Sequence, residues 1–150
     1  MELAADWVVG FVDGEGYFHI NLSPDESSTV GYQVLVEFVV VQHERDLQIL
    51  QALKRFFRAG VVRQLVDDRY CLRIRKLEPL QTVCEFFHSH PLKSKKHVDF
   101  CKFRRIMQLI DQQQPLQKDG LLEIVDIALS MSSSDVPALE QAKQVLSTTG

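Results

Sequence analysis

Residues 3–18, LAADWVVGFVDGEGYF, constrain the fold of this 150-residue chain more than any other stretch. The segment begins with the pattern of an apolar helix and ends on two acids, Asp13 and Glu15, each followed by glycine. Acids at the carbonyl end of a helix oppose the helix dipole and cost about 0.3–1 kcal/mol each. Their position indicates that a positive charge is bound there, and a divalent cation is the obvious candidate.

Small residues in the same segment predict close approach of another helix. Gly10 lies in the middle of the expected helix, where glycine costs about 0.5–1 kcal/mol relative to alanine. That cost is tolerated where a second backbone must come near, and Ala4 and Ala5 extend the same small surface. Gly14 and Gly16 predict a tight exit from the helix into a strand, with a positive φ.

The segment resembles the signature helix of the LAGLIDADG homing endonucleases, through the run GFVDGEG at residues 10–16. An amphipathic helix with an Asp-Gly turn is the alternative, and it leaves the mid-helix glycine and the paired acids unexplained. The resemblance implies that Glu15 and the backbone carbonyl of Gly14 hold a divalent ion, Mg²⁺, beside a scissile phosphate. Asp13 would support the turn and the helix interface.

A single signature helix supplies one set of acids, whereas cutting both strands of a duplex needs two. The chain therefore resembles the homodimeric branch of the family, in which two such helices pack at a two-fold axis. The implied dimer interface contains Ala4, Ala5, Gly10 and Asp13. A near-palindromic target in double-stranded DNA follows from that symmetry.

Two further polar positions match the family pattern. Gln42 ends the second expected strand, where the resemblance implies a residue that orients the attacking water. Lys95, within LKSKK at residues 92–96, falls where a lysine stabilises charge on the phosphate; Lys93 and Lys96 are close alternatives. A basic residue often lies just beyond Gln42, and the sequence leaves Arg45 and Asp46 as alternatives for that position.

The charge is distributed unevenly along the chain, although its net value is only −3. Residues 1–44 hold no Lys or Arg and eight acids, residues 45–105 carry a net charge of about +9, and residues 106–150 carry −4. A basic middle in an acidic chain creates a directed field. The pattern favours a nucleic-acid partner over a merely solvated surface.

Hydrophobic periodicity predicts nine elements after the first helix. Strands are expected at 17–23, 32–42, 61–66 and 69–76, and helices at 44–57, 77–88, 98–111, near 121–131 and near 136–146. The αββ unit thus occurs twice. This order predicts an α+β fold of the αββαββα type, with a four-stranded antiparallel sheet whose helices cover one face. We expect one domain over 1–150, with a core at about 3–111 and a helical part at about 112–150.

The other face of the sheet carries the chemistry of a DNA reader. Alternation in the strand at 69–75 places arginines on one side and Tyr70, Leu72 and Ile74 on the other. The expected DNA-binding residues are Arg69, Arg73 and Arg75, with Arg63 or Gln64 depending on register, and His19, Asn21, Ser23, Gln33 and Glu37 from the first hairpin. Arginine reads guanine, whereas Asn and Gln read adenine. A ten-residue strand spans about 33 Å, or roughly ten base pairs, so a dimer would read about twenty.

The resemblance implies a metal-dependent double-strand DNA endonuclease. The alternative is a non-cleaving nucleic-acid binder on the same scaffold, either an RNA maturase or a transcription regulator. Glu15, Gln42 and Lys95 together favour cleavage, because a pure binder has no need of them. The absence of an 18-residue apolar run argues against a membrane span. Three cysteines without CxxC spacing and an acidic first segment predict the interior of a prokaryotic cell or an organelle.

Overall fold

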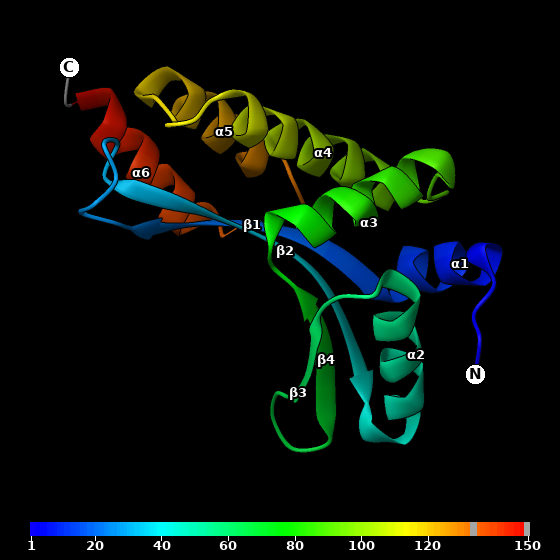
Figure 1. Cartoon of the computed structure of the whole chain (residues 1–150). Coiled ribbons are helices and arrows are strands. Elements are labelled where there is room, and N and C mark those ends of the chain that lie inside the picture. Colours follow the sequence, from blue (N-terminus) through cyan, green and yellow to red (C-terminus); the bar gives the residue numbers. More distant parts are fainter. Residues whose placement is uncertain (133–134, 149–150) are drawn as a thin grey trace. The chain divides into compact units, whose positions relative to one another are not determined.

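The computed structural model describes residues 1–132 and 135–148. In chain order its elements are α1 (Ala5–Glu15), β1 (Gly16–Pro24), β2 (Tyr32–His43), the 3₁₀ turn η1 (Glu44–Asp46), α2 (Leu47–Phe57), β3 (Val61–Gln64), β4 (Arg69–Ile74), α3 (Leu77–Ser89), α4 (Lys96–Gln112), α5 (Lys118–Leu129) and α6 (Val136–Thr148) (Figure 1). The strands form one four-stranded sheet in the order β1-β2-β4-β3. The predicted αββαββα order and antiparallel sheet are confirmed.

Residue contacts group the chain into two compact units, and each is described by itself. The first unit comprises Met1–Phe18 and Glu37–Phe100, and the second comprises His19–Val36 and Cys101–Gly150. The boundary therefore falls within β1, β2 and α4. All of α1, α2, α3 and the β3–β4 hairpin belong to the first unit.

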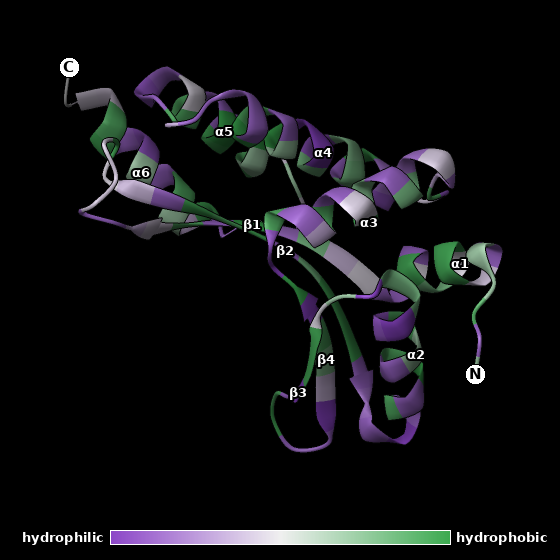
Figure 2. Cartoon of the chain, viewed as in Figure 1, coloured by the Kyte–Doolittle hydropathy of each residue, from purple (hydrophilic) through white to green (hydrophobic). Residues whose placement is uncertain are grey.

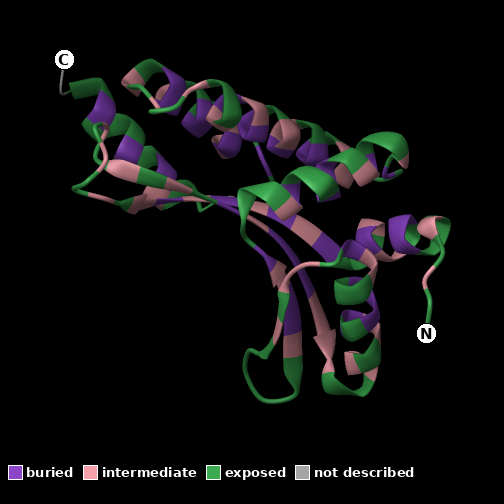
Figure 3. Ribbon diagram, viewed as in Figure 1, coloured by how far each residue is buried: buried purple, intermediate pink, exposed green. Residues whose placement is uncertain are grey.

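A cluster of phenylalanines forms the core of the first unit. The ring of Phe38 on β2 lies 5.7 Å from that of Phe57 on α2 and 6.0 Å from that of Phe87 on α3. Phe18 and Phe100 join it, with their ring centroids 5.5 Å apart. Figure 3 shows buried residues along β4 and α2, which lie side by side. Burial of one face of β2 and β4 beneath helices leaves the opposite face for another role.

The second unit contains a helical layer with a core of its own. Its buried residues on α5 and α6 include Leu121, Ile124, Ala128, Leu139, Ala142 and Leu146. Lys143 pairs with Asp126 at 2.7 Å across the two helices. Hydrophobic and hydrophilic residues alternate along both helices (Figure 2). No helix within residues 1–132 and 135–148 combines the length and the hydrophobicity that a bilayer crossing requires.

Most predicted boundaries shift by one to three residues, as at β4, which ends at Ile74 and not at Lys76, and three of the differences are instructive. The helix expected at 44–57 is divided into η1 and α2, because the backbone at Asp46 leaves the helical region with φ −112° and ψ 24°. The strand expected to reach Val66 ends at Gln64, and Asp67 adopts a left-handed φ of 51° in the turn that follows. The helix expected from Val98 begins at Lys96.

The prediction of a positive φ at Gly14 and Gly16 is wrong. Within the described residues, the glycines with positive φ are Gly31 and Gly60. Gly16 has the extended values φ −93° and ψ 165°. It serves a different purpose, because a Cβ built there would lie 2.9 Å from Cγ1 of Val12. Glycine at this position therefore permits a close approach, not a left-handed turn.

Candidate active site and nucleic-acid interface

The C-terminal end of α1 is held by the loop that precedes α4. The Asp13 carboxylate accepts hydrogen bonds from the backbone N–H groups of Lys93 at 2.7 Å and Ser94 at 3.1 Å, and from the Ser94 hydroxyl. Burial raises the pKa of the Asp13 carboxyl, but these hydrogen bonds and the charge of Lys96 lower it by more, so the net pKa lies below its ordinary value. Asp13 is thus an anchor within its own chain.

Lys96 places a positive charge beside the acids at the end of α1. Its Nζ donates to the carbonyl oxygens of Val12 and Asp13, each at 3.1 Å. A lysine there compensates the negative end of the helix dipole. Burial lowers the pKa of the Lys96 amine, and the charges of Asp13, Glu15 and Asp99 oppose that effect without cancelling it. The paired acids alone therefore do not require a metal ion.

Glu15 and Gln42 meet at the end of α1. Gln42 donates from Nε2 to Glu15 Oε2 at 3.2 Å, and the Glu15 side chain is exposed. Gln42 lies opposite Tyr70 in the β2–β4 pair. Because directly opposed residues share a face, Gln42 points to the α1 side of the sheet and away from the arginine side. The fold thus brings together two residues that the family resemblance selected from segments 27 positions apart.

The lysine contacts favour Lys96 over the predicted Lys95. Within the described residues, Lys96 is the member of the 92–96 run whose amino group contacts α1. Lys95 is exposed, and its carbonyl accepts the backbone N–H of Val98 as α4 begins. Arg45 and Asp46 fall in η1, where the Arg45 backbone N–H donates to His43 Nδ1 at 3.1 Å. The loop before α4 gave no periodic signal from which the sequence could choose among its lysines.

The strand register settles which residues share the arginine face. Arg63 lies opposite Cys71, and Gln64 lies opposite Tyr70, so Arg63 belongs with Arg73 and Gln64 does not. This face is less polar than expected, because Val39 and Cys71 beside Arg73 are 1% and 2% exposed. The aliphatic stems of arginine side chains cover apolar surface of this kind.

An acid lies among the arginines of this face. Glu37 Oε2 accepts from Arg75 Nε at 2.9 Å and lies 3.5 Å from Arg73 Nε. Burial raises the pKa of the nearby Tyr17 hydroxyl, and the negative charge of Glu37 raises it further. Arg69 is exposed at the start of β4.

The remaining predicted DNA-binding residues lie in the second unit. His19, Asn21 and Ser23 on β1 are half-buried and alternate with the buried Ile20 and Leu22, as the period-two pattern predicts. Gln33 on β2 is exposed. Their DNA contacts stay a prediction.

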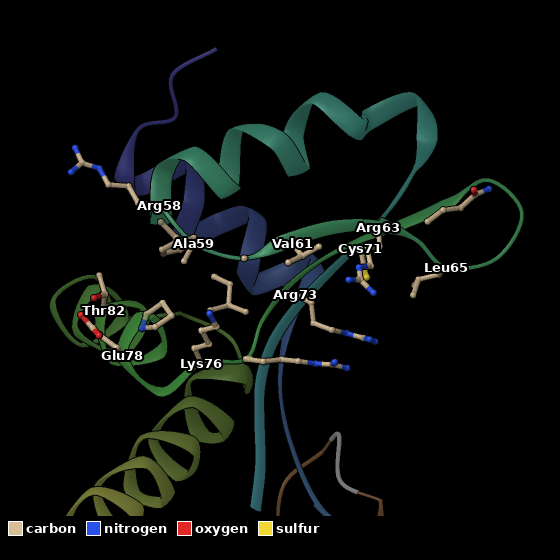
Figure 4. A pocket seen from close by; sticks show the side chains of 16 residues that line it. Arg58, Ala59, Val61, Arg63, Leu65, Cys71, Arg73, Lys76, Glu78 and Thr82 are labelled. Carbon is tan, nitrogen blue, oxygen red and sulfur yellow. The ribbon is translucent and has the colours of Figure 1, made fainter.

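A hollow of about 940 Å³ opens beside the arginine face. It is lined by β3, β4, the 58–60 loop and the start of α3, and it includes Arg63, Arg73 and Arg75. Arg58 and Lys76 also line it (Figure 4), although sequence reasoning did not select them. Arg58 is the C-cap of α2 with φ 55°, a position that helical periodicity cannot assign to a binding surface.

The exposed face of α1 carries small and aromatic residues. A Cβ built on Gly10 would meet nothing within 4 Å, and the same holds for Gly14. Trp7, 42% exposed, stacks on Phe11 with ring centroids 4.8 Å apart. Positions 7, 10, 11 and 14 follow helical spacing and form one stripe. The sequence analysis missed Trp7 and Phe11, although their spacing relative to Gly10 is the signal that identifies them.

We expect the Asp13 anchor to make stability depend on pH. Its folded-state pKa is lowered, so its contribution is present above the ordinary pKa of an aspartate and is lost as the pH falls through the folded value. Asp13→Ala should lower the free energy of unfolding by about 1–2 kcal/mol at pH 7, and by less at pH 3. Urea titrations at both pH values measure this. Asp111→Ala, which removes an exposed acid from α4, is the control; an equal loss at both pH values would contradict the anchor.

Comparison with known proteins identifies the family. A model of the LAGLIDADG endonuclease family matches residues 8–107. The protein described as probable intron-encoded endonuclease 2 of Neurospora crassa is 28% identical over 128 residues, which cover 84% of this chain and 27% of that protein. Probable intron-encoded endonuclease Cox1-I1b of Schizosaccharomyces pombe is 25% identical over 124 residues, covering 81% and 32%. The chain thus spans about a third or less of the length of these curated relatives.

Solved structures give the same result for the fold. The crystal structure of the homing endonuclease I-TnaI is 51% identical with a TM-score of 0.95, covering 97% of this chain and 99% of that one. The I-SmaMI LAGLIDADG homing endonuclease bound to cleaved DNA is 27% identical with a TM-score of 0.90, covering 97% of this chain and 49% of that one. The family match extends from α1 through most of α4, the elements that assemble Glu15, Gln42 and Lys96, and the chain belongs to the LAGLIDADG endonuclease family.

Proposed function

We propose that this chain is a site-specific endonuclease for double-stranded DNA, which acts as a homodimer with a divalent metal ion on a long, near-palindromic target. The observation that carries the proposal is the meeting of Glu15 and Gln42 at the end of a helix whose last carbonyls bind Lys96. A carboxylate, an amide and an ammonium group gathered at one exposed helix end provide the groups that phosphodiester hydrolysis uses.

The residues at the end of α1 fit a hard divalent cation such as Mg²⁺. Glu15 offers an exposed carboxylate, and the carbonyl of Gly14 lies beside it in the chain; both are oxygen ligands. Within the described residues no group of three or more His, Cys, Asp or Glu side chains is arranged to hold a metal. This suits Mg²⁺, which takes one or two carboxylates and completes its shell with water and phosphate oxygens. When bound, the metal supplies Lewis-acid polarisation of the scissile phosphate.

The other groups have separate tasks. Because Gln42 donates its amide N–H to Glu15, its amide oxygen remains available to accept a hydrogen bond from the attacking water. The ammonium group of Lys96 lies where it can stabilise negative charge on the phosphate. The arginine face of β3 and β4 supplies contacts to base edges and phosphates of the bound duplex.

One surface of α1 supports the homodimer. In the stripe formed by Trp7, Gly10, Phe11 and Gly14, all but the half-buried Phe11 are exposed, and the space above Gly10 and Gly14 is open in the single chain. An exposed tryptophan stacked on a half-buried phenylalanine, next to two glycines, is suited to a second helix that approaches closely.

A cleavage selection tests the proposal. The purified chain is incubated with a library of randomised duplexes and Mg²⁺, and the cut ends are sequenced; a chelator-treated reaction is the control. We expect metal-dependent double-strand ends within one family of sites, with two-fold related half-sites of about ten base pairs. Specific binding without cutting would instead support the non-cleaving binder, and a target without two-fold symmetry would contradict the homodimer.

Substitution of Lys95 and Lys96 separates the predicted lysine from the one that contacts α1. We expect Lys96→Ala to slow single-turnover cleavage by about 10²-fold or more, because a preorganised charge near the phosphate is lost. Lys95→Ala should have a smaller effect, since Lys95 is exposed and Lys96 remains. Both variants should keep the same base preference. If Lys95→Ala slowed cleavage more than Lys96→Ala, Lys95 would be the lysine that stabilises charge on the phosphate.

A further inference from the structure

Glu37 is an unusual residue to find on a surface that binds DNA. Its side chain is 14% exposed, whereas those of its partners Arg73 and Arg75 are 33% and 64% exposed. A carboxylate so well covered has little access to a base edge, and it would repel phosphates if it stood alone. Its observed contacts are with the two arginines, 38 residues away in sequence in the case of Arg75.

The geometry of these contacts leaves the reading edge of each arginine available. Glu37 faces both guanidinium groups at Nε: it accepts a hydrogen bond from Arg75 Nε at 2.9 Å and forms an ion pair with Arg73, whose buried Nε lies 3.5 Å away and makes no hydrogen bond within the described residues. The two terminal Nη groups of each arginine are the ones that donate together to O6 and N7 of guanine. Figure 4 shows the Arg73 side chain extending away from the ribbon of β4. A carboxylate bound at Nε restricts the torsions of the side chain without occupying those donors.

The contacts also change the charge of the surface. Two guanidinium groups and one carboxylate leave a net charge of about +1, so each arginine attracts phosphate less strongly than it would without Glu37. Attraction to phosphate is independent of sequence, whereas base contacts are not. An acid that weakens attraction to phosphate and orders the arginines for base contacts increases the difference in affinity between target and non-target DNA.

We infer that Glu37 is a positioning residue for sequence recognition: it orients Arg73 and Arg75 toward base edges and restrains their binding to phosphate, and it does not itself contact DNA. The inference rests on the proposed DNA-binding function. It differs from the sequence prediction, which placed Glu37 among the residues that contact DNA.

The first test needs no DNA. Heteronuclear NMR of the intact protein measures hydrogen exchange at the arginine Nε–H groups, assigned with Arg73→Lys and Arg75→Lys. We expect slow exchange for Arg75 in the wild type and an increase of about tenfold or more in Glu37→Gln, because a charge-assisted hydrogen bond is lost. Unchanged exchange in that variant would overturn the inference, whatever the DNA experiments show.

The second test measures binding to the selected target, to all its single-base variants and to random duplex, over a range of salt concentrations with Ca²⁺. Glu37→Gln should bind random duplex more tightly, with a salt slope steeper by about one per subunit. Its discrimination at one or two positions per half-site should fall about five- to tenfold. Glu37→Asp keeps the negative charge, but its shorter side chain reaches less far toward the arginines. This variant should therefore keep the wild-type salt slope and lose discrimination between single-base variants of the target. Glu85→Gln removes an exposed charge from α3 and is the matched control.

The outcomes separate the inference from the proposed function. If the wild type selects a target and Glu37→Gln discriminates equally well, Glu37 has no positioning role. If Glu37→Asp behaves as the wild type in every respect, the residue acts through charge alone and the orienting role is wrong. If the wild type binds no duplex selectively, the proposed function fails, and the exchange experiment still decides whether Glu37 holds the arginines.

Discussion

Glu15→Gln is expected to abolish DNA cleavage while leaving DNA binding intact. The amide keeps the shape of the side chain and can still accept the hydrogen bond from Gln42, but it lacks the charge that a divalent cation needs. We expect the single-turnover rate with Mg²⁺ to fall by at least about a thousandfold. Affinity for the target, measured by gel shift with Ca²⁺, should change less than about twofold, because Glu15 bonds to Gln42 on the opposite face of the sheet from the β4 arginines that we propose contact DNA.

The matched control for this substitution is Glu26→Gln, which removes an exposed acid from the turn between β1 and β2. It should cut at the wild-type rate. Loss of binding and cleavage together in Glu15→Gln would mean that Glu15 supports the fold of the binding surface, and a purely catalytic role would then be wrong.

Gly10→Leu should have opposite effects on the stability of the monomer and on the stability of the dimer. A side chain at Gly10 meets nothing within the chain, so the monomer should tolerate it and gain about 0.5–1 kcal/mol from the loss of glycine in a helix. Between two packed helices the same side chain should cost about 1–3 kcal/mol or more for each subunit. We therefore expect a more stable monomer, no dimer and no double-strand cleavage.

Sedimentation velocity and thermal unfolding measure the two effects independently. Gly10→Ala is the graded variant, and it should weaken the dimer less while giving a similar gain in monomer stability. A Gly10→Leu chain that sediments as an undisturbed dimer would show that the stripe on α1 is not the interface. A chain that unfolds at lower temperature would show that Gly10 packs within the monomer.

Local pattern was sufficient for most of the fold. Period-two alternation identified β1 and β4, and helical period identified α2 and α3, because each of these elements buries one face. The errors occur where burial does not decide the conformation. Leu65 and Val66 have the composition of a strand, yet they are 46% and 64% exposed in a turn.

The candidate site could be predicted only in part. Glu15 and Gln42 were found through the family resemblance, which places them at the ends of a helix and a strand that the sequence pattern defines, and the fold then joins them by a hydrogen bond. The contact of Lys96 with α1 spans 84 positions in sequence, so no local rule distinguishes it from Lys93 and Lys95. Glu37 was placed on the correct face for the same local reason, but its partners depend on strand register, which the sequence left open.

The anchor between Asp13 and Ser94 has a consequence for when the site at the end of α1 assembles during synthesis of the chain. The two residues are 81 positions apart, and α1 is synthesised long before the loop that completes its end. A contact between distant segments has to await both of them and forms late in folding. On the ribosome, a growing chain that has not reached Lys96 has neither the anchor nor the ammonium group beside Glu15. The groups proposed to act in cleavage, Glu15, Gln42 and Lys96, therefore assemble only when most of the polypeptide has been synthesised.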